Sequence, residues 1–77
     1  MQPRIASAVL LSSRLSKREL QVLVLLCDGL HAKDVARWLS ISSKTVEFHK
    51  EGIANKIGAK GVAQMVRYAI RKGLIEP

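Results

Sequence analysis

The sequence contains little cysteine, proline, aromatic or acidic character. Its 77 residues include one cysteine, two prolines, one residue each of Trp, Tyr and Phe, and six acidic residues. The single thiol, Cys27, excludes an internal disulfide, and its apolar surroundings predict a buried, unreactive side chain in a reducing compartment. The longest apolar run, 22–27, is far shorter than the about 20 residues that cross a bilayer, so we expect no membrane segment.

The residues that usually build catalytic or metal sites are equally scarce. The only histidines are His31 and His49, and together with Cys27 they form no recognised metal-ligand spacing. The sequence shows neither a nucleophile paired with a base nor a glycine-rich phosphate loop. We therefore predict no enzymatic activity, no catalytic residue, no metal and no cofactor, and we expect His49 to have a structural role at the edge of a helix.

Basic residues, in contrast, are abundant. Thirteen Lys and Arg against six acidic residues give a formal net charge of +7. An excess of this size on one small domain favours a polyanionic partner, above all nucleic acid. A membrane surface, an acidic protein or simple solubilising charge are the alternatives.

Local signals predict an all-α fold. Ser16 and Glu19 have the spacing of a capping box, and Gly29, Gly58 and Gly73 suit helix ends. The first predicted helix is apolar around nearly its whole circumference, so it needs cover on more than one side. We expect four helices, at 17–28, 32–39, 43–57 and 62–72, the last burying Val62, Met65, Val66 and Ala69 and exposing Gln64, Arg67, Tyr68 and Arg71. Residues 3–11 form either a further helix or a linker.

The second and third predicted helices have the pattern of a helix-turn-helix. Apolar residues fall at Val35, Ala36, Leu39, Ile41 and Val46, and the small Ala36 suits a close helix crossing. In such a unit the second helix is presented to the DNA major groove.

The third helix has two distinguishable faces. At 100° per residue, Val46, Ile53 and Ile57 cluster on one side and should pack on the core. The opposite side supplies the candidate base contacts, Lys44, Glu47, Phe48 and Glu51. In a major groove the Phe48 ring can contact a thymine methyl group, and Glu47 can accept from a cytosine amino group. Alternatively, Phe48 covers a neighbouring helix or a dimer surface.

Residues flanking this face are candidates for phosphate contacts, which position a protein on DNA without reading sequence. They are Lys33, Ser43, Thr45, Lys50 and Lys56. For each lysine, a merely solvated charge is the alternative.

From 15 to 75 the sequence resembles the LuxR-type helix-turn-helix domain of bacterial response regulators and quorum-sensing regulators. The matching stretches are Leu15-Ser16-Lys17-Arg18-Glu19, Lys33-Asp34-Val35-Ala36, Leu39-Ser40-Ile41-Ser42, Lys44-Thr45-Val46, Lys56-Ile57-Gly58 and Gly73-Leu74-Ile75. The resemblance implies a compact four-helix domain at 15–77 after a linker at 1–14, with base contacts from the third helix. It also implies a dimer formed through the last helix, for which we expect Ala63, Val66, Arg67 and Ile70.

The function implied by the resemblance is that of a cytoplasmic, sequence-specific transcriptional regulator. Its implied partners are double-stranded DNA, a second copy on that DNA, RNA polymerase, and a receiver or sensor domain that would precede this chain. A sigma-factor C-terminal domain and a protein-interaction module that antagonises a regulator are the competing interpretations.

Several residues depart from the family pattern. The carboxylates of Glu47 and Glu51 would repel phosphates and lower affinity. Gly52 interrupts a helix at a cost of about 1 kcal/mol relative to alanine, which suggests a close approach to the backbone there. Ser40 stands where a glycine is common in the turn. The apolar Leu20 and Val24 suggest a dock for residues 5–11.

Overall fold

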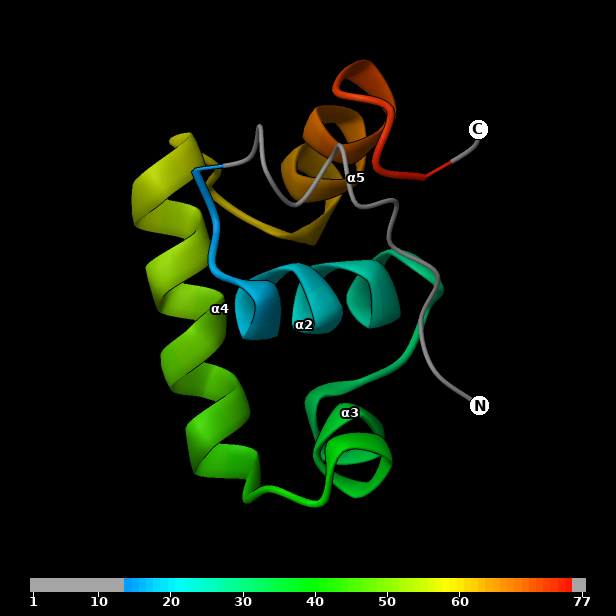
Figure 1. Ribbon diagram of the computed structural model, residues 1–77, viewed down its shortest axis with the longest axis vertical. Helices are drawn as coiled ribbons and strands as arrows, with labels where there is room; N and C mark the ends of the chain where they lie inside the picture. The colour runs from blue at the N-terminus through cyan, green and yellow to red at the C-terminus, as the bar shows by residue number, and fades with distance from the viewer. Residues whose placement is uncertain (1–13, 76–77) are drawn as a thin grey trace.

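The computed structural model describes residues 14–75, which form helices and connecting turns without any strand. The helices are α2 (Lys17–Cys27), α3 (Ala32–Leu39), α4 (Ser43–Ile57) and α5 (Val62–Arg71) (Figure 1). The all-α prediction is confirmed, and every predicted helix start agrees with the structure. Two helices end one residue earlier than predicted, because Asp28 and Lys72 are caps rather than helical residues. The predictions for residues 3–11, including their docking on Leu20 and Val24, lie outside the described residues.

The helix starts follow from local hydrogen bonds. The Ser16 hydroxyl accepts from the Glu19 N–H at 3.1 Å, and the Glu19 carboxylate accepts from the Ser16 N–H at 2.8 Å, which completes the predicted capping box. At α4, the Ser42 hydroxyl accepts from the Thr45 N–H at 3.0 Å. At α3, His31 provides no side-chain cap, and its own N–H donates to the Asp34 carboxylate at 3.3 Å.

The turn between α3 and α4 contains an unusual backbone conformation. Ser40 has φ 55° and ψ 44°, and it is the one non-glycine residue with positive φ in the described part of the chain. The left-handed region costs L-residues free energy through a clash of Cβ with the backbone, which explains why glycine suits this position. The next N–H, of Ile41, donates to the Ala36 carbonyl at 3.0 Å and closes the turn.

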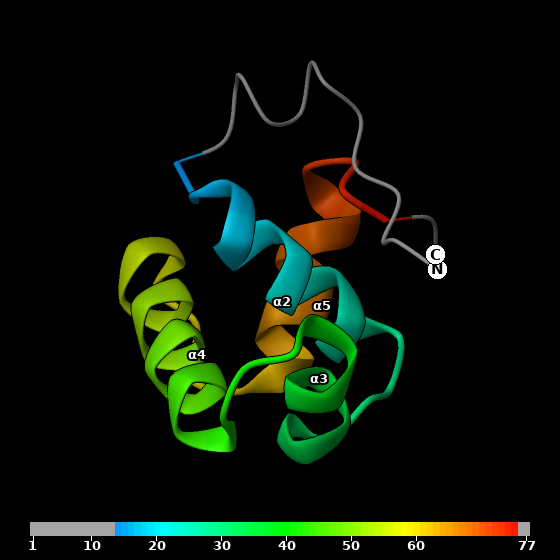
Figure 2. The same cartoon turned by 60° about the horizontal axis from the view of Figure 1, so that its bottom comes forward.

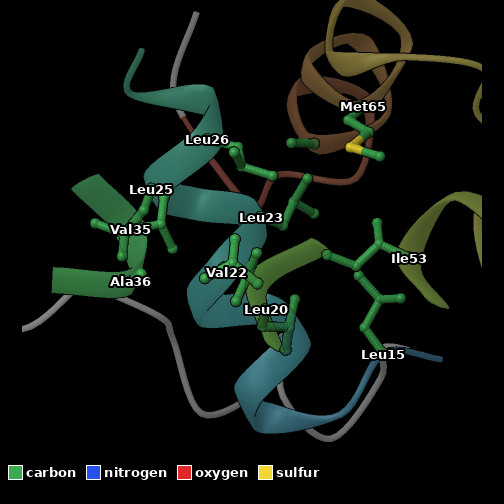
Figure 3. Close-up of a cluster of buried hydrophobic side chains, with 12 residues drawn as sticks. Leu15, Leu20, Val22, Leu23, Leu25, Leu26, Val35, Ala36, Ile53 and Met65 are labelled. Carbon is green, nitrogen blue, oxygen red and sulfur yellow. The ribbon is translucent and has the colours of Figure 1, made fainter. Parts of the chain in front are cut away.

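The core is organised around α2, which contacts α3, α4 and α5 (Figure 1). Fully buried side chains from three helices meet there: Leu20, Val22, Leu23, Val35 and Ile53 (Figure 3), together with Val46 of α4. Met65 and Ala69 of α5 cover a further side of α2. The prediction that this helix needs cover on more than one side is confirmed.

The burial predictions for Val62 and Tyr68 are wrong, whereas the prediction that Ile57 packs against the core is confirmed. Ile57 is only partly buried, because it is the last residue of α4. Val62 is 38% exposed, since the first residue of α5 lies at the edge of the core. Tyr68, which was expected to face outward, packs partly against the core.

Candidate nucleic-acid interface

The helix-turn-helix unit is formed by α3 and α4, which lie against each other with the 40–42 turn between them (Figure 2). Ala36 is 6% exposed, so its small side chain is part of the core. Ile41 packs partly against the core and anchors the turn. These contacts hold α4 with one long side turned away from the rest of the domain.

The two faces of α4 are those that its sequence predicts. Val46 and Ile53 have no exposed surface, whereas Phe48 is 72% exposed. The Phe48 ring makes an edge-on contact with the partly buried His49, with 5.9 Å between ring centroids. Phe48 therefore does not cover a neighbouring helix of its own described chain. The other candidates for base contacts are exposed on the same helix: Lys44, Glu47 and Glu51.

The candidate phosphate contacts differ in how exposed they are and in the partners that they already have. Lys33 and Ser43 are exposed in the first turns of α3 and α4. Thr45 is partly buried, and its hydroxyl forms a 2.9 Å hydrogen bond with that of Ser42. Lys50 is also partly buried, and its Nζ lies 3.7 Å from a carboxylate oxygen of Glu47. Exposed ion pairs of this kind are weak, so Lys50 remains available to another anion.

Lys56 differs from the other cations because it has a structural partner. Its Nζ donates to Oε1 of Glu19 at 2.7 Å, which joins the last turn of α4 to the first turn of α2. Lys56 therefore contributes to the contact between two helices, and with its side chain 45% exposed it stays a candidate for a phosphate contact. Burial alone would raise the pKa of Glu19, but the Lys56 ammonium and the Ser16 hydrogen bonds outweigh it and hold the pKa below the ordinary value of 4.5.

The Glu19 carboxylate also explains why a glycine stands at position 52 in the middle of α4. A Cβ atom at this position would lie 2.8 Å from Oε2 of Glu19. The close approach that Gly52 permits is therefore to the Glu19 side chain. The sequence identified Glu19 only as a capping residue, and the glycine on α4 was the one sign of a further contact.

The predicted dimer residues lie together on α5. Ala63, Arg67 and Ile70 are exposed and Val66 is partly buried, while Met65 and Ala69 on the other side of the helix are buried. The described part of the chain leaves this surface uncovered.

The described residues give little support for a metal site, a reactive thiol or a membrane-spanning helix. Between residues 14 and 75, no three His, Cys, Asp or Glu side chains come together as a metal site. Burial raises the pKa of the Cys27 thiol to about 11, so this thiol stays protonated near neutral pH. None of the helices formed by these residues has the length and apolar character to cross a membrane.

Comparison with known proteins identifies the family. Residues 13–69 match the family described as bacterial regulatory proteins, luxR family. The chain belongs to the LuxR family of regulatory proteins.

It is also similar to the oxygen regulatory protein NreC of Staphylococcus aureus, for example in strains JH9, JH1 and USA300, with 47% identity over 62 residues. That alignment covers 80% of this chain but 29% of NreC, so the chain spans less than a third of the length of that relative. The LuxR family is one of transcription regulators and not a class of enzymes.

Proposed function

We propose that this chain is the DNA-binding output domain of a bacterial transcriptional regulator and inserts α4 into the major groove. The observation that carries the proposal is the 72% exposure of Phe48 on a helix whose opposite side, at Val46 and Ile53, is sealed in the core. An exposed aromatic ring on a helix-turn-helix recognition helix gains free energy when it leaves water for a groove. Membership of the LuxR family supports the same function.

The exposed side chains of α4 suit direct readout of bases. The Phe48 ring can pack on a thymine methyl group, and the Glu47 carboxylate can accept from a cytosine amino group. Lys44 can donate to guanine, and Glu51, one turn after Glu47, offers a second acceptor.

Contacts to phosphates would fix the position of α4. Lys33 lies in the first turn of α3, where the helix N-terminus also attracts anions. We propose the same role for Ser43, Thr45, Lys50 and Lys56. The Lys56 ammonium group donates to Glu19, but it has three N–H donors and its side chain is 45% exposed, so it can also donate to a phosphate.

Binding by a single domain should be weak and strongly salt-dependent, because few cations face the phosphates and Glu47 and Glu51 oppose them. We propose that two copies bind neighbouring half-sites through the α5 surface formed by Ala63, Val66, Arg67 and Ile70. Linking two weak sites raises the effective concentration of the second.

The rest of the regulator is inferred from the relatives. NreC is about three times longer than the matched region and is named an oxygen regulatory protein. We propose that a receiver or sensor domain precedes this domain in the intact regulator, that the regulator acts in the cytoplasm, and that it works with RNA polymerase at promoters.

The proposal is tested by selecting bound duplexes from a random pool and measuring specific and random-sequence binding of the wild type and variants. We expect the combination Glu47→Ala and Phe48→Ala to abolish the preference for the selected duplex while circular dichroism shows a retained fold. Asp28→Ala is the matched control, because it removes an exposed carboxylate away from α4. An unchanged footprint from the double variant would refute this recognition face. Failure of the wild type to bind any duplex at low salt would favour a protein-interaction module.

A further inference from the structure

A pocket of about 270 Å³ lies between the C-terminal end of α4 and one side of α5. Its lining residues come from the end of α4 and the following turn and from α5: Ile57, Gly58, Ala59, Gln64, Arg67, Tyr68 and Arg71. None of the residues that we assign to base or phosphate contacts lines this pocket. It is therefore a second feature of the surface that the proposed DNA interface does not explain.

Two arginines give the pocket a positive charge that no acidic residue of the described stretch 52–75 offsets. Arg67 and Arg71 are one helical turn apart, and the described stretch 52–75 contains five basic residues and no acidic residue. Neither arginine forms an ion pair within residues 14–75. Like charges at this spacing destabilise a helix, so the arrangement costs stability unless an anion binds.

The Arg71 side chain is partly positioned in advance. Its guanidinium carbon lies 5.8 Å from the centre of the Tyr68 ring, in the range of a cation–π contact. Tyr68 is itself packed against the core, so the ring is a fixed support. A guanidinium group held in this way loses less freedom when it binds a planar carboxylate.

The pocket also offers hydrogen-bond acceptors. The N–H groups of Gly58 and Ala59 both donate to the Ala54 carbonyl. The carbonyls that follow Ala54 in α4 have no helical N–H donor, so this end of the helix carries partial negative charge. Since Ile57, Gly58 and Ala59 line the pocket, a ligand there lies near this helix end as well as near the two arginines.

We propose that this pocket binds an acidic peptide segment of a partner protein. An Asp or Glu side chain supplies the carboxylate for Arg67 and Arg71, while the peptide N–H groups donate to the carbonyls at the end of α4. A phosphodiester can pair with the two arginines, but it has no N–H donor for the carbonyls at the end of α4. The partial negative charge of that helix end would also repel it. Since Arg67 also borders the proposed dimer surface, Arg71 is the residue that distinguishes the two.

The test uses the 77-residue chain labelled with nitrogen-15 and the peptide acetyl-Gly-Glu-Asp-Glu-Gly-amide. We expect saturable amide shifts centred on Gly58 and Ala59, with a dissociation constant on the order of 1 mM, a range typical of a small, solvated site. Arg71→Gln should weaken binding at least about fivefold. Arg71→Lys should weaken it less, because lysine keeps the positive charge but lacks the planar guanidinium group that can form two parallel hydrogen bonds to a carboxylate. Arg18→Gln, an exposed arginine on α2, is the matched control and should leave binding unchanged.

Three outcomes would overturn the proposal. The first is equal binding of the uncharged peptide acetyl-Gly-Gln-Asn-Gln-Gly-amide. The second is that inorganic phosphate or a DNA duplex, at matched ionic strength, shifts Gly58 and Ala59 as strongly as the acidic peptide does, which would assign the pocket to phosphate groups. The third is that Arg71→Gln binds the peptide like the wild type.

Discussion

The Nζ atom of Lys56 lies 2.7 Å from Oε1 of Glu19, so one ion pair joins the last turn of α4 to the first turn of α2. The same oxygen accepts the Ser16 N–H at 2.8 Å. Glu19 is 6% exposed and is the buried charged residue of the described core. A buried carboxylate is tolerated when its hydrogen bonds are satisfied and an opposite charge is close, and Glu19 meets both conditions.

Glu19 should make the stability of the domain depend on acidity. Its pKa is lowered in the folded state, so its contribution to stability is complete above the ordinary value of 4.5 and is lost as the pH falls through the lower folded value. We expect the free energy of unfolding to fall more steeply between about pH 5 and pH 3 in the wild type than in Glu19→Gln. Urea unfolding followed by circular dichroism at a series of pH values measures this difference. Parallel profiles for the two proteins would mean that Glu19 has the same pKa in the folded and unfolded states.

Gly52→Ala should fail to stabilise the domain, although alanine is favoured by about 1 kcal/mol over glycine within a helix. The added Cβ would lie 2.8 Å from Oε2 of Glu19, whose carboxylate is held by Ser16 and Lys56 and cannot easily move. In the background of Glu19→Ala the space is free, and there the same substitution should stabilise. A double-mutant cycle of unfolding free energies measures the coupling, which we expect to exceed about 0.5 kcal/mol. Simple additivity of the two changes would contradict this contact.

Ser40→Gly should stabilise the domain by about 0.5–1 kcal/mol. Ser40 has φ 55° and ψ 44°, and glycine adopts this conformation without the Cβ clash, although its freedom in the unfolded chain offsets part of the gain. Ser40→Ala keeps a Cβ atom and serves as the control, with stability close to that of the wild type. Thermal unfolding of the three proteins provides the comparison, and a destabilised glycine variant would show that the Ser40 side chain makes a compensating contact.

The local features of this fold could be predicted from sequence because they depend on neighbouring residues. The capping box at Ser16 and Glu19 fixes the start of α2, and helical periodicity separates Phe48 from Val46 on α4. The exposure of Val62 could not be predicted in this way, since it depends on where the other helices end.

Contacts between distant segments were also beyond the sequence. Glu19 and Lys56 are 37 positions apart, and no local spacing links them. Likewise, Arg71 appeared only as an exposed residue, because its relation to Gly58 and Ala59 depends on how α5 folds back against the end of α4. Whether Lys33, Lys44, Glu47 and Glu51 contact DNA stays a prediction.

Glu19 has a mechanical consequence for the domain. Its side chain caps the first turn of α2 and contacts α4 through Lys56 and Gly52, so the start of α2 is joined directly to the helix that carries Phe48. We expect a displacement of the first turn of α2 to reach α4 through these contacts.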